Sequence, residues 1–244
     1  MIELAALPGV PEVRPGDDLA ALLAEAAERI GGLRPTDVLV VAHKVVSKAE
    51  GRVVPLHTVF PGWEARDLAD EHGKDPRHVQ VILDESEEIL RADRGRLICR
   101  TRHGFVCANA GVDASNAGAS ETLVLLPQDP DGSARALRRQ LGCAIVVSDS
   151  FGRAWRVGQC EVAIGCAGLE PADDWRGRPD AGGRDLAATV VAIADEAAAA
   201  ADLVRGKDTL EPAVRVRGLE RHVTAADGPG AAALVRARED DLFR

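Results

Sequence analysis

One apolar run constrains the fold more than any other part of the sequence. Residues 143–147 (CAIVV) predict a buried strand, because a short β-branched run bounded by polar residues suits the interior of a sheet. Ser148, Asp149 and Ser150 end this strand, and a Gly-Arg turn follows. Carboxylate and hydroxyl oxygens at a strand end suit Mg²⁺ or Mn²⁺ bound together with phosphate groups. An Asx-type turn that only caps the strand is the alternative interpretation.

A second buried strand is predicted at 38–41 (VLVV), and it leads into a polar segment from His43 to Lys48. Lys44 and Lys48 stand next to the end of this strand, so they are candidates to neutralise phosphate oxygens. Lysines that simply face water are the alternative. The six histidines form neither H-x-x-x-H nor H-E-x-x-H, so spacing alone assigns them no catalytic role.

A loop of small residues, 109–118 (NAGVDASNAG), contains Asp113, Ser115 and Asn116. An ordinary turn between strands is one interpretation. However, two aspartates from separate strand ends, Asp113 and Asp149, are the minimum needed to hold a pair of hard cations against a phosphate chain. The two loops together therefore favour a metal and phosphate site.

The remaining pattern mixes helices and strands without steady strand-helix-strand alternation, which predicts an α+β fold. A helix at 19–30 opens after Asp17 and Asp18 and closes at Gly31. Further helices are predicted at 63–93 with a break at Asp75-Pro76, at 133–140 and at 185–206, and further strands at 96–112, 121–127 and 212–218. The alanine-rich helix runs out at 204–207 (VRGK), where either a helix stop or a nucleotide-contacting loop is expected.

Length, charge and cysteine content exclude several classes of protein. A chain of 244 residues allows one large domain or two small, closely associated ones. The formal net charge of -9 argues against nucleic acid as the main partner. Neither a membrane-length apolar run nor a signal peptide is present, so a cytoplasmic protein without a membrane partner is expected. The five cysteines lack metal-ligand spacing and are predicted to be reduced core thiols.

Neither a P-loop nor a Rossmann glycine motif occurs, so any nucleotide must be held in another way. Five longer motifs nevertheless resemble one family, the coenzyme F420-0:L-glutamate ligases, also called gamma-glutamyl ligases. They are GVPEVRPGDDL at 9–19, KVVSKAEGR at 44–52, GVDASN at 111–116, SDSFGRAWRVGQ at 148–159 and ADEAAAAADLVRGK at 194–207. The resemblance covers essentially the whole chain.

The resemblance implies an enzyme that uses GTP to add L-glutamate to the deazaflavin precursor F420-0. The first bond is an amide to the lactyl carboxylate, later ones are gamma-glutamyl linkages, and an acyl phosphate is the expected intermediate. It also implies two divalent cations, Mg²⁺ or Mn²⁺, with K⁺ as a further candidate ion, and a homodimer. The expected fold is α+β with two closely associated subdomains across residues 1–244, without a C-terminal nitroreductase-like domain.

The family's site residues are carried over position by position. The metal ligands correspond to Asp113 and Asp149 for one cation and Ser150 for the second. The contacts to GTP correspond to Val10, Pro11, Glu12, Val13, His43, Lys44, Lys48, Asn116, Arg205, Gly206, Lys207, Asp208, Thr209, Leu210, Glu211 and Pro212.

Three positions depart from the family pattern. His43 replaces a small or amide side chain, and Ser150 replaces a frequent threonine. Lys207 stands near a position where some relatives offer Gln or Glu to the second metal, and because a lysine carries no oxygen ligand it is expected to meet phosphate directly.

Arg153 and Arg156 are candidates to bind substrate carboxylates through bidentate contacts. The residues point to no general base for the glutamate amine. Two other functions stay open from the sequence: a noncatalytic deazaflavin or nucleotide carrier, and a metal-dependent phosphohydrolase that uses Asp113 and Asp149.

Overall fold

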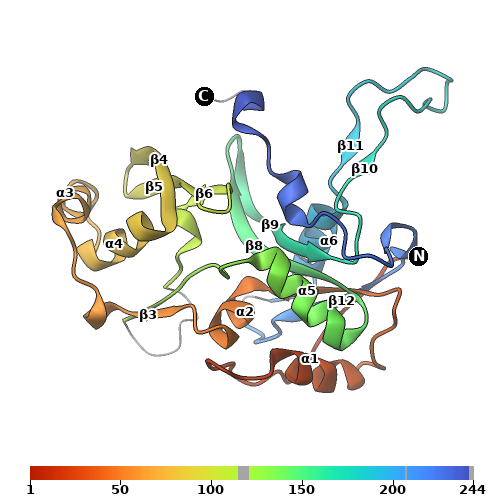
Figure 1. The fold of residues 1–244 in the computed structure, drawn as a ribbon, viewed down its shortest axis with the longest axis horizontal. Helices are drawn as coiled ribbons and strands as arrows, with labels where there is room; N and C mark the ends of the chain where they lie inside the picture. Colours follow the sequence, from red (N-terminus) through yellow and green to blue (C-terminus); the bar gives the residue numbers. More distant parts are fainter. Residues whose placement is uncertain (115–120, 207, 242–244) are drawn as a thin grey trace.

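A mixed sheet forms the centre of the molecule. The computed structural model describes residues 1–114, 121–206 and 208–241 (Figure 1). Within these residues, a five-stranded sheet has the order β1-β12-β2-β8-β9. Its strands are β1 (Glu3–Ala6), β12 (Ala213–Arg217), β2 (Val38–Ala42), β8 (Ala144–Arg153) and β9 (Arg156–Ala167). Only β2 and β8 run parallel; the other neighbours are antiparallel. The α+β class and the strands predicted at 38–41 and 212–218 are confirmed.

Both faces of this sheet are buried, which explains the continuous apolar runs. Leu39 and Val41 of β2 pack with α1 (Leu19–Glu28) and α5 (Pro130–Leu141) on one face. Val38 and Val40 pack with α6 (Ile193–Asp202) on the other (Figure 1). Because side chains alternate along a strand, a strand buried on both faces must be apolar at every position.

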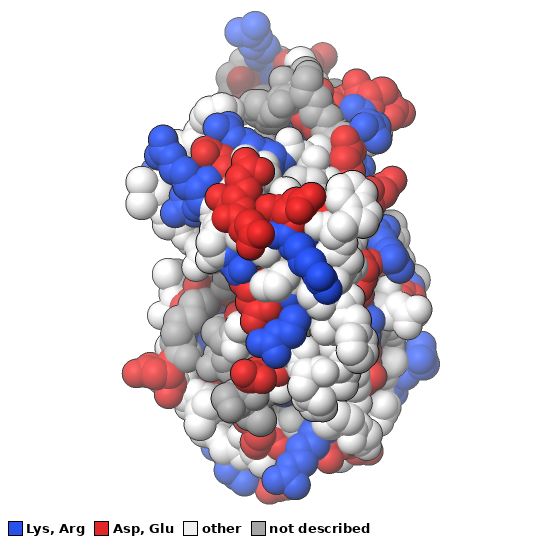
Figure 2. Space-filling model, turned by 90° about the vertical axis from the view of Figure 1, so that its left-hand side faces the viewer, with Lys and Arg blue, Asp and Glu red and all other residues white. Residues whose placement is uncertain are grey.

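A second, smaller core lies to one side of the sheet. It contains α3 (Trp63–His72), α4 (Pro76–Glu85) and a three-stranded sheet of β4 (Ser86–Asp93), β5 (Arg96–Thr101) and β6 (Val106–Ala108). The ribbon β3 (Val53–Pro55) with β7 (Thr122–Val124) leads to it from the central sheet (Figure 1). Acidic and basic side chains are interspersed on the side of the molecule that Figure 2 shows.

Three sequence predictions of elements are corrected. Residues 86–93 form strand β4 rather than the end of a helix, because they pair with β5. The helix predicted at 185–206 shortens to α6, since Val190–Val191 forms β11 and pairs with β10 (Asp173–Asp174). Strand β8 does not stop at Ser148 but continues to Arg153, paired with β9.

The remaining elements are short. They are α2 (His43–Ala49) and the 3₁₀ turns Leu56–Thr58, Asn109–Gly111, Glu220–His222, Ala231–Leu234 and Arg238–Asp240. No helix in the described ranges is long and apolar enough to cross a bilayer. None of the five cysteines forms a disulfide. Four are buried, as predicted for core thiols, whereas Cys160 is partly exposed.

Candidate nucleotide and metal site

Helix α2 organises the candidate site. Strand β2 ends at Ala42 and α2 begins at His43, so the polar segment expected from the sequence is one short helix. Helical spacing places His43 beside Ser47, and the His43 Nδ1 atom lies 3.4 Å from Ser47 Oγ. His43 and Lys48 are buried, although both carry polar groups. Buried polar side chains require partners, and α2 finds them in three other segments.

Each basic side chain of α2 faces a carboxylate from a different part of the chain. Lys48 Nζ lies 2.6 Å from Glu12 Oε1, and Lys44 Nζ lies 2.6 Å from Asp113 Oδ2. His43 Nε2 lies 3.3 Å from Asp149 Oδ1. The structure thus brings together lysines and aspartates that the sequence placed in separate loops.

Local packing presents Glu12 to α2. Val10 and Val13 are buried in the same core cluster as α1, whereas the Glu12 side chain is 60% exposed. The backbone N–H of Gly16 donates to the carbonyl of Ala49 at 2.9 Å and fixes this segment against the end of α2. Apolar anchors on either side of Glu12 therefore hold its carboxylate at the surface beside Lys48.

Asp113 is held by backbone pairing with β7. Its N–H and C=O both bond to Val124, at 3.0 and 2.9 Å. A turn just before it, formed by Asn109, Ala110 and Gly111, has φ of 53°, 52° and 72°. Consecutive left-handed residues that include two non-glycines are strained, and such strain persists only where the surrounding structure holds it. This turn ends at Gly111, two residues before Asp113.

Asp149 and Ser150 contact different groups although they are neighbours on β8. Asp149 faces His43 of α2, and its Oδ1 atom also accepts the Ser150 N–H at 2.7 Å. The Ser150 hydroxyl donates instead to Glu161 Oε1 of β9, the residue opposite it in the ladder. This divergence follows from the alternation of side chains along a strand. The predicted strand end at these residues is wrong, and so is the alternative of an Asx-type turn that only caps the strand, because both residues lie inside the β8–β9 hairpin.

The loop after α6 reaches the same region. The Arg205 side chain is 8% exposed, and its Nη2 atom lies 2.8 Å from Glu161 Oε2. At the other end of the loop, the Pro212 carbonyl accepts the N–H of Ala42 at 2.8 Å, directly before α2. The first residue of the predicted nucleotide loop, Arg205, therefore contacts Glu161, and its last residue, Pro212, contacts Ala42 directly before α2. Lys207 and Asn116 lie outside the described residues.

Within this loop, Gly206, Asp208, Thr209 and Leu210 are exposed. The Thr209 hydroxyl donates to the Gly206 carbonyl at 3.2 Å, and Leu210 has a φ of 56°. Asp208, Thr209 and Leu210 thus present their side chains to solvent near the junction of β2 and α2.

Glu161 is a site residue that the sequence analysis missed. Its side chain is 4% exposed, which is rare for a carboxylate without a partner. The available signal was an acidic residue just before the apolar run 162–167 (VAIGCA) of β9. A charge at the edge of a buried strand predicts an ion pair, but not which arginine provides it.

The structure does not bring Arg153 and Arg156 to the carboxylates. Both are exposed near the tip of the β8–β9 hairpin, where they face each other in the ladder. The Arg153 guanidinium donates to the Val157 carbonyl of its own hairpin at 2.6 Å. Their role in carboxylate binding stays a prediction.

The donor chemistry of the cluster fits hard divalent cations. In the described ranges, no three His, Cys, Asp or Glu side chains gather as a ready-made metal cluster. Asp113, Asp149 and Ser150 nevertheless offer carboxylate and hydroxyl oxygens, which Mg²⁺ and Mn²⁺ prefer. Asp113 faces the ammonium group of Lys44, so its charge is partly balanced before any cation binds, and Asp149 faces the imidazole of His43.

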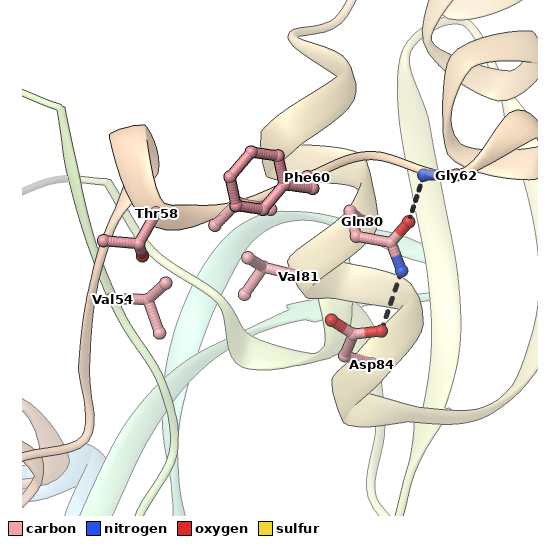
Figure 3. Close-up of a pocket in the computed structure, with 8 residues that line it drawn as sticks. Val54, Thr58, Phe60, Gly62, Gln80, Val81 and Asp84 are labelled. Atoms are coloured by element: carbon pink, nitrogen blue, oxygen red, sulfur yellow. Dashed lines mark hydrogen bonds between the residues drawn. The ribbon is translucent and has the colours of Figure 1, made fainter.

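A separate pocket lies in the second core. It has a volume of about 490 Å³ and lies between α4 and the segment after β3 (Figure 3). Gln80 lies at one side of it, accepting the Gly62 N–H and donating to Asp84, both at 2.8 Å. The lining residues are Val54, Thr58, Val59, Phe60, Gly62, Gln80, Val81 and Asp84. This lining contains a carboxylate and no basic residue, which does not suit a triphosphate.

Fold and site define an α+β protein in which basic and oxygen-donor side chains meet beside the central sheet. A family model described as F420-0:Gamma-glutamyl ligase matches residues 9–218. The coenzyme F420:L-glutamate ligase of Methanothermobacter thermautotrophicus is 45% identical over 100% of this chain and 99% of its own. The ligase of the same name from Methanopyrus kandleri is 47% identical over 96% and 94%, and that of Natronomonas pharaonis 44% identical over 100% and 95%. The chain belongs to the F420-0:gamma-glutamyl ligase family and is an enzyme of the ligase class.

Proposed function

We propose that this enzyme uses GTP and two divalent cations, Mg²⁺ or Mn²⁺, to join L-glutamate to F420-0. The proposal assigns residues 1–244 to one ligase domain of two closely associated subdomains. One observation carries it: α2 gathers His43, Lys44 and Lys48 against carboxylates from three distant segments. Such a cluster matches what phosphoryl transfer needs, which is positioning and charge stabilisation.

The chemistry explains why a nucleotide is required. A carboxylate is a poor electrophile at neutral pH, so one of its oxygens first attacks the γ-phosphorus of GTP and GDP leaves. The glutamate amine then attacks the carbonyl carbon of the acyl phosphate. Loss of phosphate and of one amine proton completes the amide, and repetition on the new γ-carboxylate gives the gamma-glutamyl linkage.

The chain's own residues have distinct parts in this scheme. Lys44 and Lys48 would move from their carboxylate partners to phosphate oxygens, because an ammonium group neutralises either. Asp113 and Asp149 would hold one cation and Ser150 the other, and bound cations supply charge neutralisation at the phosphates. The loop 205–212, together with Val10–Val13, would contact the nucleotide from either side of α2.

Mass spectrometry of the product tests the proposal directly. The purified protein is incubated with F420-0, GTP, Mn²⁺ and L-glutamate, and each component is omitted in turn. We expect mass increments of one glutamate that require all four components. Loss of GTP without these increments would instead establish a phosphohydrolase, and tight F420-0 binding without turnover would establish a carrier.

We also propose that the enzyme is a homodimer. The β8–β9 hairpin carries exposed apolar side chains at its tip, with Trp155 79% and Val157 97% exposed. Exposed apolar patches of this kind mark interaction surfaces. Light scattering after size-exclusion chromatography should give twice the chain mass of 25.7 kDa, and a monomer at micromolar concentration would contradict the proposal.

A further inference from the structure

Glu161 lies where it can control the hydroxyl of Ser150. The two residues are opposite each other on β9 and β8, and the Ser150 hydroxyl donates its proton to Glu161 Oε1. In this bond the hydroxyl is the donor and the carboxylate oxygen the acceptor. The hydroxyl proton therefore points at Glu161, and the lone pairs of Ser150 Oγ point elsewhere.

Arg205 faces the buried Glu161 carboxylate. Their side chains are 8% and 4% exposed, and the Nη2 and Oε2 atoms are 2.8 Å apart. Asp202 Oδ1 lies 3.8 Å from the same Arg205 Nη2 atom. The arginine is always protonated, so it places a positive charge beside this buried carboxylate.

The contacts of Arg205 join two parts of the candidate site. Arg205 begins the loop 205–212, and its Nη1 atom also lies 3.4 Å from the Pro212 carbonyl at the end of that loop. The guanidinium of the first residue of this loop thus contacts β9 and the last residue, Pro212. A displacement of Glu161 would be transmitted to the loop as well as to Ser150.

We propose that Glu161 is a positioning residue for the second divalent cation: it orients the Ser150 oxygen toward that cation and, through Arg205, fixes the nucleotide loop beside it. This inference rests on the proposed function, because it assumes a cation at Ser150. Carboxylates that orient a metal ligand from behind are a general feature of metal sites, and their loss weakens metal binding by about 10- to 100-fold.

Metal binding without turnover tests the proposal. Electron paramagnetic resonance of free Mn²⁺ gives the number and affinities of bound ions for the wild type, Glu161→Gln and Glu161→Asp. In Glu161→Gln we expect the weaker of two Mn²⁺ affinities to fall about 10- to 100-fold, with the tighter one changed less than about threefold. Glu161→Asp retains the charge and should recover part of the loss. Unchanged Mn²⁺ affinities in folded Glu161→Gln would overturn the proposal.

A double-mutant cycle shows whether Glu161 acts through Ser150. If it does, Glu161→Gln has no further effect on Mn²⁺ affinity once Ser150→Ala has removed the hydroxyl. Equal effects of Glu161→Gln with and without Ser150 would overturn the positioning role and indicate direct contact with the ion. If Glu161→Gln fails to fold, Glu161→Asp replaces it in the same cycle.

A matched control separates positioning from general stability. Asp37 is another buried carboxylate that faces an arginine, with Oδ1 2.9 Å from Arg217 Nε, and it lies at the start of β2 away from Ser150. Asp37→Asn should lower the melting temperature without changing Mn²⁺ affinity or the KM for GTP. Glu161→Gln should raise the KM for GTP in addition, because Arg205 loses its partner.

The proposed function and this inference fail in different ways. A wild type that ligates glutamate but binds a single Mn²⁺ overturns the inference and the second cation of the proposed function, and leaves the ligase activity standing. A wild type that binds two Mn²⁺ ions but forms no ligation product overturns the proposed function, and the effect of Glu161→Gln on Mn²⁺ affinity still decides the inference.

Discussion

Asp149 combines a nearly buried carboxylate with a position at the centre of the site. Its side chain is 16% exposed and faces His43. We predict that Asp149→Ala lowers metal-dependent turnover by at least about 100-fold, since loss of a metal ligand costs more than loss of a residue behind one. The fold should persist, with a stability loss of about 1 kcal/mol for the missing His43 contact. Ligation assays and thermal unfolding measure the two effects.

A second aspartate provides the control for this substitution. Asp174 lies in β10, exposed, and pairs with Arg176 at 2.6 Å, which holds the pKa of its carboxyl down at about 2. Asp174→Ala also removes an ion-paired carboxylate, but one far along the chain from the cluster around α2. Turnover should remain at the wild-type level. Wild-type activity in folded Asp149→Ala would remove Asp149 from the metal site.

The buried cysteines predict a specific pattern of chemical modification. Burial raises the pKa of Cys107, Cys143 and Cys166 to about 12, and the charge of Asp149 adds to this for Cys107. Because the thiolate is the nucleophile, these three residues should resist alkylation by iodoacetamide at pH 8. Cys160 is partly exposed and should react first. Mass spectrometry of the native protein measures this, and rapid alkylation of Cys143 would contradict the burial described here.

At the scale of single residues, the charged side chains of the site could be predicted from the sequence, whereas the pairs that they form could not. Lys44, Lys48, Asp113 and Asp149 could be found because each follows a recognisable buried strand or small-residue loop. That Lys44 faces Asp113 could not be found, since the pairing depends on how α2 and the ribbon of β3 and β7 meet in space. Glu161 was missed because its role exists only through its cross-strand neighbour.

At the scale of elements, Asp75 illustrates a cap that makes a pH-dependent contribution. It precedes α4 and accepts the Arg77 N–H at 2.8 Å, and hydrogen bonds from the Arg77 side chain lower the pKa of its carboxyl below the ordinary 3.8. We predict that Asp75→Ala lowers the free energy of unfolding by about 1 kcal/mol. A lowered folded-state pKa stabilises the protein above the unfolded-state pKa, and this contribution disappears as the pH falls through the folded-state value.

The difference between wild type and Asp75→Ala should therefore be constant from about pH 5 to 8 and shrink below about pH 4. Urea unfolding at several pH values measures it. Asp84, in the last turn of the same helix, provides the comparison, because Asp84→Ala removes a carboxylate without removing a cap. A difference that grows toward acid pH would show that Asp75 does not act as an ionised cap.

Local signals at helix ends also decided how well elements could be predicted. The helix at 19–28 and the break at Asp75-Pro76 were found because capping aspartates and glycines act within one turn. Strand β4 was taken for helix because its charged, exposed pattern resembles a helix surface, and only pairing with β5 makes it a strand. The helix predicted at 185–206 is longer than α6, because the alanine run has a high helix propensity and strand β11 forms only through its pairing with β10.

At the scale of the whole molecule, the proposed site links three parts of the chain that are far apart in sequence. α2 follows strand β2 of the central sheet, and the loop 205–212 follows α6. Asp113 pairs with Val124 of β7, in the ribbon that leads to the second core. A ligand that contacts all three should stabilise the folded protein as a unit. Binding at about 100 times the dissociation constant contributes about 2.7 kcal/mol.

For a chain of this size, that stabilisation corresponds to a rise in melting temperature of about 5 to 10 °C. We predict this rise for GTP with Mn²⁺, a much smaller one for GTP with EDTA, and none for guanosine, because the proposed site would engage phosphates and cations rather than the nucleoside alone. Lys48→Met should abolish the rise, since it removes a buried cation from the phosphate contacts. An equal rise with guanosine would place the binding energy on the base and contradict a phosphate site at α2.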